Sequence, residues 1–286
     1  MQMRLALPPP MATLPRMVNV RLIRIFQALA LCAVSFPALA ASSEWAEVEG
    51  GSVRIVTEGL PDEAGMLRGA LEIDLKPGWK TYWRDPGESG IPPTVTVISP
   101  EGGAEADIGF PAPARFNEGF SVWAGYDRSV ALALTFSLPD AGTVERLGIS
   151  VFLGICEVIC IPVQAGLDVD LTNNSEAVLD RDVVEGAFAV LPRAADPGFG
   201  AALREFHRGN IVVDAEIPSG SGEAELFVVS TEDWAFGTPK RTGGPSGTAF
   251  DIPILMAPES HASPDTVHYT LVAGEDAVSG TFEIAR

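Results

Sequence analysis

The sequence predicts an all-β protein, and three observations support this prediction. Short runs rich in Val, Ile, Leu and Thr recur through residues 45–172, with Gly, Pro, Asp or Asn between them. Several of these runs alternate apolar with polar residues, and no helical pattern separates them. After one helical segment, a second series of such runs follows. We therefore expect an immunoglobulin-like antiparallel sandwich, then a short helix and a second, smaller β domain. The runs of the first region are "SVRIVTEG", "LRGALEIDL", "PTVTVIS", "SVALALTFSL", "RLGISVFLGI" and "AGLDVDLT".

The period-2 alternation ends near Asn173. The stretch "SEAVLDRDVVEGAFAVLP" that follows has the pattern of an amphipathic helix, with Asn174 or Ser175 as its cap and Pro192 as its stop. The next stretch, "RAADPGFG", has the composition of a linker. We therefore expect helix and linker over residues 173–204, between a first domain at 41–172 and a second at 205–286.

The second domain is predicted from five β runs, and it contains no motif that carries chemistry. His207, His261 and His268 are scattered without the spacing of metal ligands. The sequence therefore predicts neither a metal site nor a cofactor. The runs are "NIVVDAEI", "EAELFVVS", "GTAFDIPIL", "TVHYTLVA" and "VSGTFEIA".

Residues 1–40 have the features of a secretory signal peptide. Four arginines and no acidic residue precede Glu44, and the apolar run "IFQALALCAVSF" follows the arginines. Ala38-Leu39-Ala40 fits the small-x-small rule for cleavage. The apolar run is too short to span a bilayer. We therefore expect an exported mature chain that is not embedded in the membrane.

The charge of the chain excludes two classes of partner. Of 286 residues, 38 are acidic and 19 basic; removing residues 1–40 leaves 15 basic residues and a net charge of −23. Such a surface repels nucleic acid and anionic membranes. The full sequence is 47% hydrophobic, and the 246 residues that remain can form real cores without needing a disulfide to fold.

Two cysteines lie close together in "ICEVICIP", at positions 156 and 160. On an extended strand their Cα atoms would be about 13 Å apart, whereas a disulfide needs less than about 7 Å. If they bond, the chain must turn through residues 157–159. Gly154 allows a kink before the turn, and Ile161-Pro162 is expected to break ladder pairing after it. The pair is thus expected at the rim of the sandwich, where another protein can reach it.

Three uses of the pair are open at this point. The first use is structural, but a disulfide that encloses five residues adds only about 2 kcal/mol to the free energy of unfolding, so it stabilises the fold weakly. Two thiolates can hold Cu(I), although only Glu157 stands beside them as a further ligand. Reversible exchange is the third use, and the pattern favours it. Because the motif holds no Lys, Arg or His, activation of a thiolate must come from elsewhere.

Three blocks carry a family resemblance: "GWKTYWRDPGESGIPPTVTV" (78–97), "FPAPARFNEGFSVWAGYD" (110–127) and "VFLGICEVICIPV" (151–163). In this order they resemble the N-terminal periplasmic domain of the DsbD/ScsB family of thiol:disulfide interchange proteins. The cysteine spacing is closer to the ScsB branch. The family's membrane and thioredoxin-like domains are missing from this sequence, so the resemblance implies an electron source on a separate chain.

The resemblance also implies roles for individual residues. Cys160 would attack, or be attacked by, a partner's sulfur, and Cys156 would resolve the mixed disulfide. A cap loop would lie at Phe116, Asn117, Glu118, Gly119 and Phe120; an ordinary hairpin loop with two core aromatics is the alternative. Tyr126 is expected either to hydrogen-bond near the pair or to be a corner tyrosine of the sandwich. Trp79, Tyr82 and Trp83 are expected to be core aromatics without chemistry.

These observations predict a periplasmic thiol:disulfide interchange protein, acting as a protein-disulfide reductase or electron carrier. It would take electrons from a membrane transporter or a thioredoxin-like partner and pass them to exported proteins. The alternative is a non-catalytic periplasmic module that binds copper or a protein, with Cys156 and Cys160 as ligands or as a structural disulfide.

The signal peptide leads to a first prediction. Mass spectrometry of the exported protein is expected to find a chain that starts at Ala41, because cleavage follows Ala40. Cys32 lies in the apolar run after the bulky Leu31, where a lipidated cysteine requires a small residue. A mature chain that retains a lipid on Cys32 would contradict this expectation.

Overall fold

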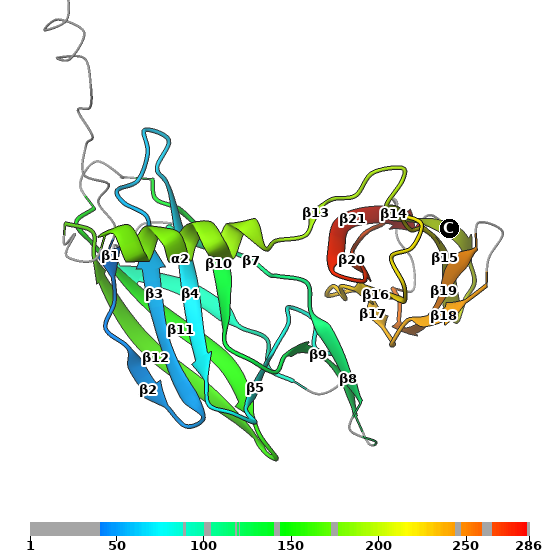
Figure 1. Cartoon of the computed structure of the whole chain (residues 1–286), viewed down its shortest axis with the longest axis horizontal. Coiled ribbons are helices and arrows are strands. Elements are labelled where there is room, and N and C mark those ends of the chain that lie inside the picture. Colours follow the sequence, from blue (N-terminus) through cyan, green and yellow to red (C-terminus); the bar gives the residue numbers. More distant parts are fainter. Residues whose placement is uncertain are drawn as a thin grey trace, which may run out of the picture. The chain divides into compact units, whose positions relative to one another are not determined.

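The computed structural model describes residues 41–87, 90–99, 104–117, 119, 121–139, 144–172, 177–243, 247–258 and 265–284. The expected signal peptide lies outside these residues. The described part is predominantly β-structure with one helix, which confirms the predicted all-β class (Figure 1).

The first part of the chain forms two facing antiparallel sheets, as expected for an immunoglobulin-like sandwich. One sheet has the order β1-β3-β4-β10-β7, with β2 beside β3, and the other has the order β12-β11-β5-β9-β8, with β6 beside β11. The strands are β1 (Ala41–Ser42), β2 (Ala46–Val48), β3 (Gly51–Thr57), β4 (Met66–Leu75), β5 (Lys80–Tyr82), β6 (Thr94–Ser99), β7 (Glu105–Gly109), β8 (Ala114–Asn117), β9 (Val122–Tyr126), β10 (Val130–Ser137), β11 (Arg146–Cys156) and β12 (Cys160–Asp170).

The core of the sandwich follows from the alternation seen in the sequence. Along β12, every second residue from Val163 to Val169 is buried and those between them are exposed. On β11, Leu153 and Ile155 are fully buried. These side chains meet those of β3, β4 and β10 in one apolar cluster between the sheets. Burial on this scale, rather than the cysteine pair, accounts for the stability of the sandwich.

Helix α2 (Ala177–Ala189) covers the outer face of the first sheet, and Figure 1 shows it lying across β3, β4 and β10. Its Val184 and Ala187 pack on Val56, Ala70 and Ala133. This confirms the predicted amphipathic helix, although its expected caps lie outside the described residues. No helix within the described ranges is long and apolar enough to cross a membrane.

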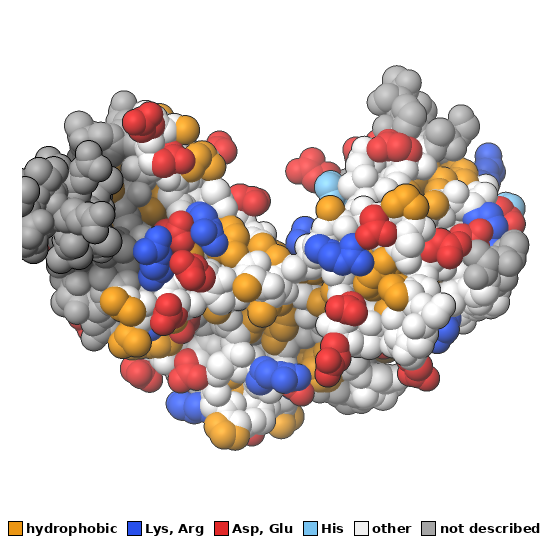
Figure 2. Space-filling model, turned by 45° about the horizontal axis from the view of Figure 1, so that its top comes forward, with side chains coloured by type: hydrophobic (Ala, Val, Ile, Leu, Met, Phe, Trp, Pro, Cys, Tyr) orange, Lys and Arg blue, Asp and Glu red, His pale blue; other side chains and the backbone are white. Residues whose placement is uncertain are grey.

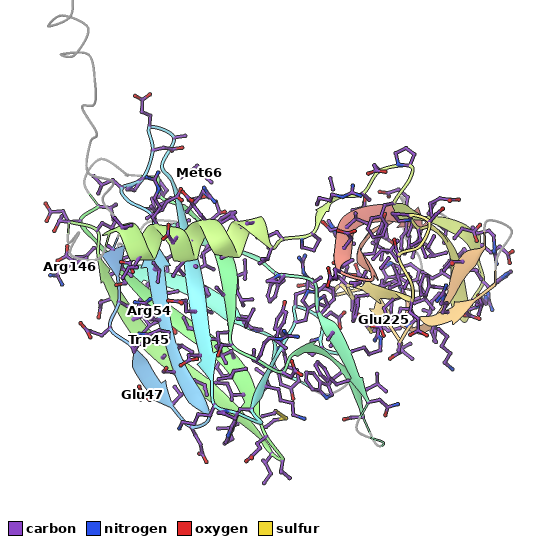
Figure 3. All side chains as sticks on the ribbon, in the orientation of Figure 1. Trp45, Glu47, Arg54, Met66, Arg146 and Glu225 are labelled. Carbon is purple, nitrogen blue, oxygen red and sulfur yellow. A yellow bond between two sulfur atoms is a disulfide. The ribbon has the colours of Figure 1, made fainter. Side chains whose placement is uncertain are left out.

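The same outer face holds a charged cluster beside the helix. The Arg54 guanidinium forms an ion pair with Glu72 and lies 3.9 Å from the carboxylate of the buried Asp180 on α2. It also stacks over the Trp45 ring, 4.7 Å from the ring centroid (Figure 3). An arginine with these partners can be largely buried because both its charge and its planar face are satisfied.

The second series of strands forms two further sheets with an apolar core of their own. Their orders are β13-β21-β20-β16 and β14-β15-β19-β17, with β18 beside β19. Residue 205, where the sequence predicts this domain to start, lies inside β14, and we retain the division into domains as a proposal. The strands are β13 (Arg193–Ala194), β14 (Gly200–Phe206), β15 (Asn210–Glu216), β16 (Ala224–Val228), β17 (Ala235–Phe236), β18 (Lys240–Thr242), β19 (Thr248–Met256), β20 (Asp265–Ala273) and β21 (Asp276–Ile284).

Candidate functional site

The cysteine pair closes the end of the long β11–β12 hairpin. The two strands pair continuously from Arg146 opposite Asp170 to Cys156 opposite Cys160. The chain turns through residues 157–159, as expected from the sequence. The two Cα atoms are therefore 4.2 Å apart, and the sulfurs form a disulfide. A hairpin whose last pair is two cysteines brings the two sulfurs within reach of each other.

Two expectations about the flanking residues were wrong. Pro162 does not break the ladder, because it lies within β12 opposite Gly154. It is tolerated there because β12 is the outer strand of its sheet among the described strands, where a missing N–H need not remove a ladder bond. Gly154 makes no kink either. Its role is to leave space, since a Cβ there would lie 3.0 Å from the Tyr82 ring and 2.9 Å from Ile91.

The two sulfurs differ in their access to solvent. Cys156 is only 4% exposed and packs in a small apolar cluster, whereas Cys160 is exposed. The turn between them is apolar and open: Val158 is 92% exposed and Ile159 is 74% exposed. A reagent or a protein therefore reaches Cys160 before it reaches Cys156.

The Tyr82 hydroxyl contacts both sulfur atoms, at 2.8 Å from each. A disulfide sulfur carries no hydrogen, so the hydroxyl is the donor. Burial raises the pKa of Tyr82 above its ordinary value, which keeps the proton on the oxygen at neutral pH. The site thus has a fixed hydrogen-bond donor directed at the S–S bond.

Side chains alternate between the two faces of β5, and this alternation directs the Tyr82 hydroxyl toward the disulfide. Thr81 points away from the disulfide, and its hydroxyl donates to the Gly154 carbonyl at 2.9 Å. Lys80 and Tyr82, two residues apart, therefore share the opposite face of β5. Lys80 is the register partner of Cys156, and its ammonium lies 5.1 Å from the centroid of the Trp123 ring. A positive charge is thus present beside the site, although the cysteine motif itself contains none.

Three rings form an aromatic layer against the disulfide: Phe116, Trp123 and Tyr82. Phe116 stacks on Trp123 with ring centroids 4.2 Å apart, and Trp123 meets Tyr82 edge-on at 5.6 Å. Trp123 and Tyr82 are each 4% exposed, and the layer packs on Cys156. The aromatic layer therefore excludes water from one sulfur and leaves the other open.

Asn117 of the expected cap is the last residue of β8. The Asn117 side chain accepts a hydrogen bond from the Gly119 amide at 2.9 Å. Gly119 has a φ of 86°, in the left-handed region that glycine adopts readily. Glu118 and Phe120 lie outside the described residues. Of the expected cap, Phe116 is the residue that the structure brings to the cysteine pair.

Tyr126 is placed away from the sulfurs. It is 8% exposed in the sandwich core, and its hydroxyl donates to the Pro111 carbonyl at 2.9 Å, a backbone bond like that of a corner tyrosine. Tyr82, which the sequence indicates only as a core aromatic, is the tyrosine that contacts the sulfurs. Its contact with Cys156 joins residues 74 positions apart, so no local pattern marks it.

The arrangement is suited to thiol chemistry. Within the described ranges, no group of three or more His, Cys, Asp or Glu side chains is placed to hold a metal ion. An attack on the accessible Cys160 would leave the bonding electrons on the buried Cys156 sulfur, to which the Tyr82 hydroxyl could donate a hydrogen bond.

Comparisons with known proteins find a similar family domain and a similar fold. Residues 61–171 match the family model of the N-terminal domain of the thiol:disulfide interchange protein DsbD. The fold is similar to the crystal structure of the N-terminal periplasmic domain of ScsB from Proteus mirabilis, with a TM-score of 0.71 and 18% identity over 86% of this chain and 98% of that one. A conserved domain protein from Bacillus anthracis aligns over 84% of this chain and 88% of its own with 11% identity and a TM-score of 0.24. No curated protein sequence matches the chain.

Residues 61–171 therefore form a DsbD-type N-terminal domain, with its cysteine pair closed as a disulfide. The predicted resemblance to the DsbD/ScsB family is confirmed, and so is the immunoglobulin-like fold that it implies.

The contact of Gly154 with Tyr82 gives a second prediction. Gly154→Ala is expected to displace the Tyr82 ring, to destabilise the fold by about 1–3 kcal/mol, and to slow reduction of the disulfide by dithiothreitol, because the displaced hydroxyl no longer donates to the leaving Cys156 sulfur. Gly166→Ala is the control on the same hairpin, because a Cβ there meets no atom within 4 Å; its effect should stay within about 0.5 kcal/mol. Urea unfolding and reduction rates measure both effects. Equal behaviour of the two variants would contradict the assigned role of Gly154.

Proposed function

We propose that this chain is a periplasmic thiol:disulfide interchange protein, which passes electrons from a membrane transporter or a thioredoxin-like partner to exported proteins. The single observation that carries the proposal is the asymmetry of the pair: an exposed Cys160 bonded to a buried Cys156, with the Tyr82 hydroxyl 2.8 Å from both sulfurs. Two observations support the periplasmic location: the N-terminus has the features of a signal peptide, and the similar ScsB domain is periplasmic.

The first half-cycle reduces the pair. A thiolate of the partner attacks the Cys160 sulfur, the S–S bond breaks, and its electron pair leaves on Cys156. Cys160 is then joined to the partner in a mixed disulfide. The partner's second thiolate attacks the partner sulfur of that bond and releases Cys160. Two electrons have moved, so the partner is now a disulfide and the chain a dithiol.

The second half-cycle runs in the opposite direction. The Cys160 thiolate attacks a disulfide of an exported protein and forms a mixed disulfide with it. Cys156 then attacks the Cys160 sulfur, which re-forms the internal disulfide and releases the substrate as a dithiol. Cys156 needs no access to solvent for this step, because its target is its own register partner on β12.

The Tyr82 hydroxyl supports both half-cycles. When Cys156 leaves as a thiolate, the hydroxyl donates a charge-assisted hydrogen bond to it, which is stronger than a bond to a neutral sulfur. The raised pKa of Tyr82 keeps this proton in place. This donor supplies the activation that the cysteine motif lacks.

The open turn beside Cys160 is suited to a protein partner. Val158 and Ile159 present exposed apolar side chains in the turn next to Cys160. Acidic side chains are scattered over the face drawn in Figure 2, whereas these two residues of the tip are uncharged. A partner with an apolar groove beside its own reactive thiol fits this tip.

The order of attack is tested by trapping. Cys156→Ala keeps the exposed Cys160 but removes the resolving thiol, so it is expected to accumulate a mixed disulfide with a thioredoxin-like protein, seen on a non-reducing gel. Cys160→Ala should trap far less, because Cys156 is buried. Equal trapping would contradict the order, and no trapping by either variant would favour a structural disulfide or a copper site.

The apolar tip is tested by a fourth prediction. Ile159→Ser is expected to slow reduction by a thioredoxin-like protein about fivefold, which corresponds to losing ~1 kcal/mol of apolar contact. Reduction by dithiothreitol should not change, because that reagent needs no docking. The control is Leu255→Ser on β19, a similarly apolar and 55% exposed residue in the second β series. If both variants slow the protein partner equally, the tip is not its docking site.

A further inference from the structure

The strands that carry the aromatic layer have a second, opposite face. Phe116 and Tyr82 point to the disulfide, and their sequence neighbours Arg115 and Trp83 point the other way, as alternation in extended chain requires. Those neighbours contact β16, which belongs to the second β series. The sequence neighbours of the residues that cover the sulfurs therefore contact β16 on the opposite face.

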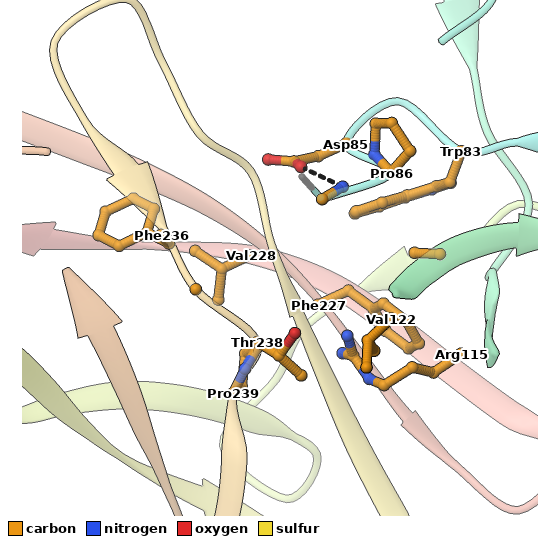
Figure 4. A pocket seen from close by; sticks show the side chains of 13 residues that line it. Trp83, Asp85, Pro86, Arg115, Val122, Phe227, Val228, Phe236, Thr238 and Pro239 are labelled. Atoms are coloured by element: carbon orange, nitrogen blue, oxygen red, sulfur yellow. Dashed lines mark hydrogen bonds between the residues drawn. The ribbon is translucent and has the colours of Figure 1, made fainter. Parts of the chain in front are cut away.

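Phe227 on β16 is the centre of these contacts. It is 2% exposed and packs with the core of the sandwich rather than with the second core. Its ring meets Trp83 edge-on, with centroids 5.7 Å apart, and the Arg115 guanidinium lies 4.4 Å from its centroid. Figure 4 shows the Phe227 ring beside that guanidinium. One side chain thus contacts both neighbours of the aromatic layer.

Polar bonds fix the same contact. Nη2 of Arg115 donates to the Leu226 carbonyl at 2.8 Å, and Glu225 lies 3.9 Å from Nε. The Asp85 carboxylate accepts a hydrogen bond from the Ser230 amide at 2.6 Å. The cavity beside these groups has a volume of about 30 Å³, and Arg115 and Phe227 are among the residues that line it (Figure 4). The contact is therefore held by polar bonds as well as by packing of the rings.

The position of strand β8 depends on this contact more than the positions of the other strands in its sheet do. It is four residues long and is the last strand of its sheet, paired only with β9 among the described strands. Short edge strands open at low free energy because few bonds hold them. Phe116 leaves Trp123 if β8 moves, so whatever anchors Arg115 also keeps the aromatic layer closed.

We propose that Arg115 and Phe227 are positioning residues, through which the second β series holds the aromatic layer over the cysteine pair from behind. The second β series then takes part in the redox function, because it determines how readily Cys156 becomes exposed. The inference rests on the proposed function, since the layer matters to exchange only if the pair exchanges thiols.

The test measures the rate at which a small alkylating reagent modifies the Cys156 thiol in the reduced, full-length mature protein, which requires no partner and reports the exposure of Cys156 directly. Phe227→Ala and Arg115→Gln are each expected to raise this rate roughly fivefold to tenfold, because each removes a contact that holds β8. The matched control is Leu226→Ala. Leu226 is the neighbour of Phe227 on β16, but its side chain packs in the second core, so its truncation destabilises without touching the layer.

Wild-type rates in both Phe227→Ala and Arg115→Gln overturn the proposal, and so does an equal increase in Leu226→Ala. If Phe227→Ala does not fold, Arg115→Gln decides, because its side chain lies at the edge of the contact and is 18% exposed. Failure of the proposed function gives a different result: the Cys156→Ala protein traps no partner, whatever the alkylation rates are.

Discussion

The site depends on the register of one hairpin. Strands β11 and β12 pair Cys156 with Cys160, and this pairing places the two sulfurs together on one face of the sheet, where Cys156 is buried and Cys160 is exposed. A slip of one residue would reverse every side chain of β12 and separate the sulfurs. The alternating burial from Val163 to Val169 prevents that slip, because a slipped strand would expose these apolar residues. The sandwich core thus fixes the geometry of the disulfide at its rim.

In the function we propose, access to this disulfide and its activation are separate. Access is through Cys160 and the apolar turn beside it, whereas activation comes from the buried Tyr82 hydroxyl, which the aromatic layer on Cys156 holds in place. The disulfide itself stabilises the fold little, because it closes a loop of five residues. Stability therefore comes from the two apolar cores rather than from this bond.

Local patterns in the sequence were enough to predict the sandwich, the helix at 177–189 and the turn between the cysteines. They depend on alternation and on the short reach of a disulfide, both of which act over a few residues. Tyr82 could not be predicted in this way, because the pairing of β5 with β11 decides that it, and not Tyr126, contacts the sulfurs. Pro162 was misjudged for a related reason: only the sheet order shows that its strand is at an edge.

The most direct test of the account is a redox titration of the mature protein, with the thiols of Cys156 and Cys160 alkylated after equilibration at graded potentials. An exchange pair is expected to titrate between about −180 and −270 mV, the range of thioredoxin-like partners. A midpoint below about −300 mV, typical of structural disulfides, would contradict the central claim that this bond exists to be exchanged.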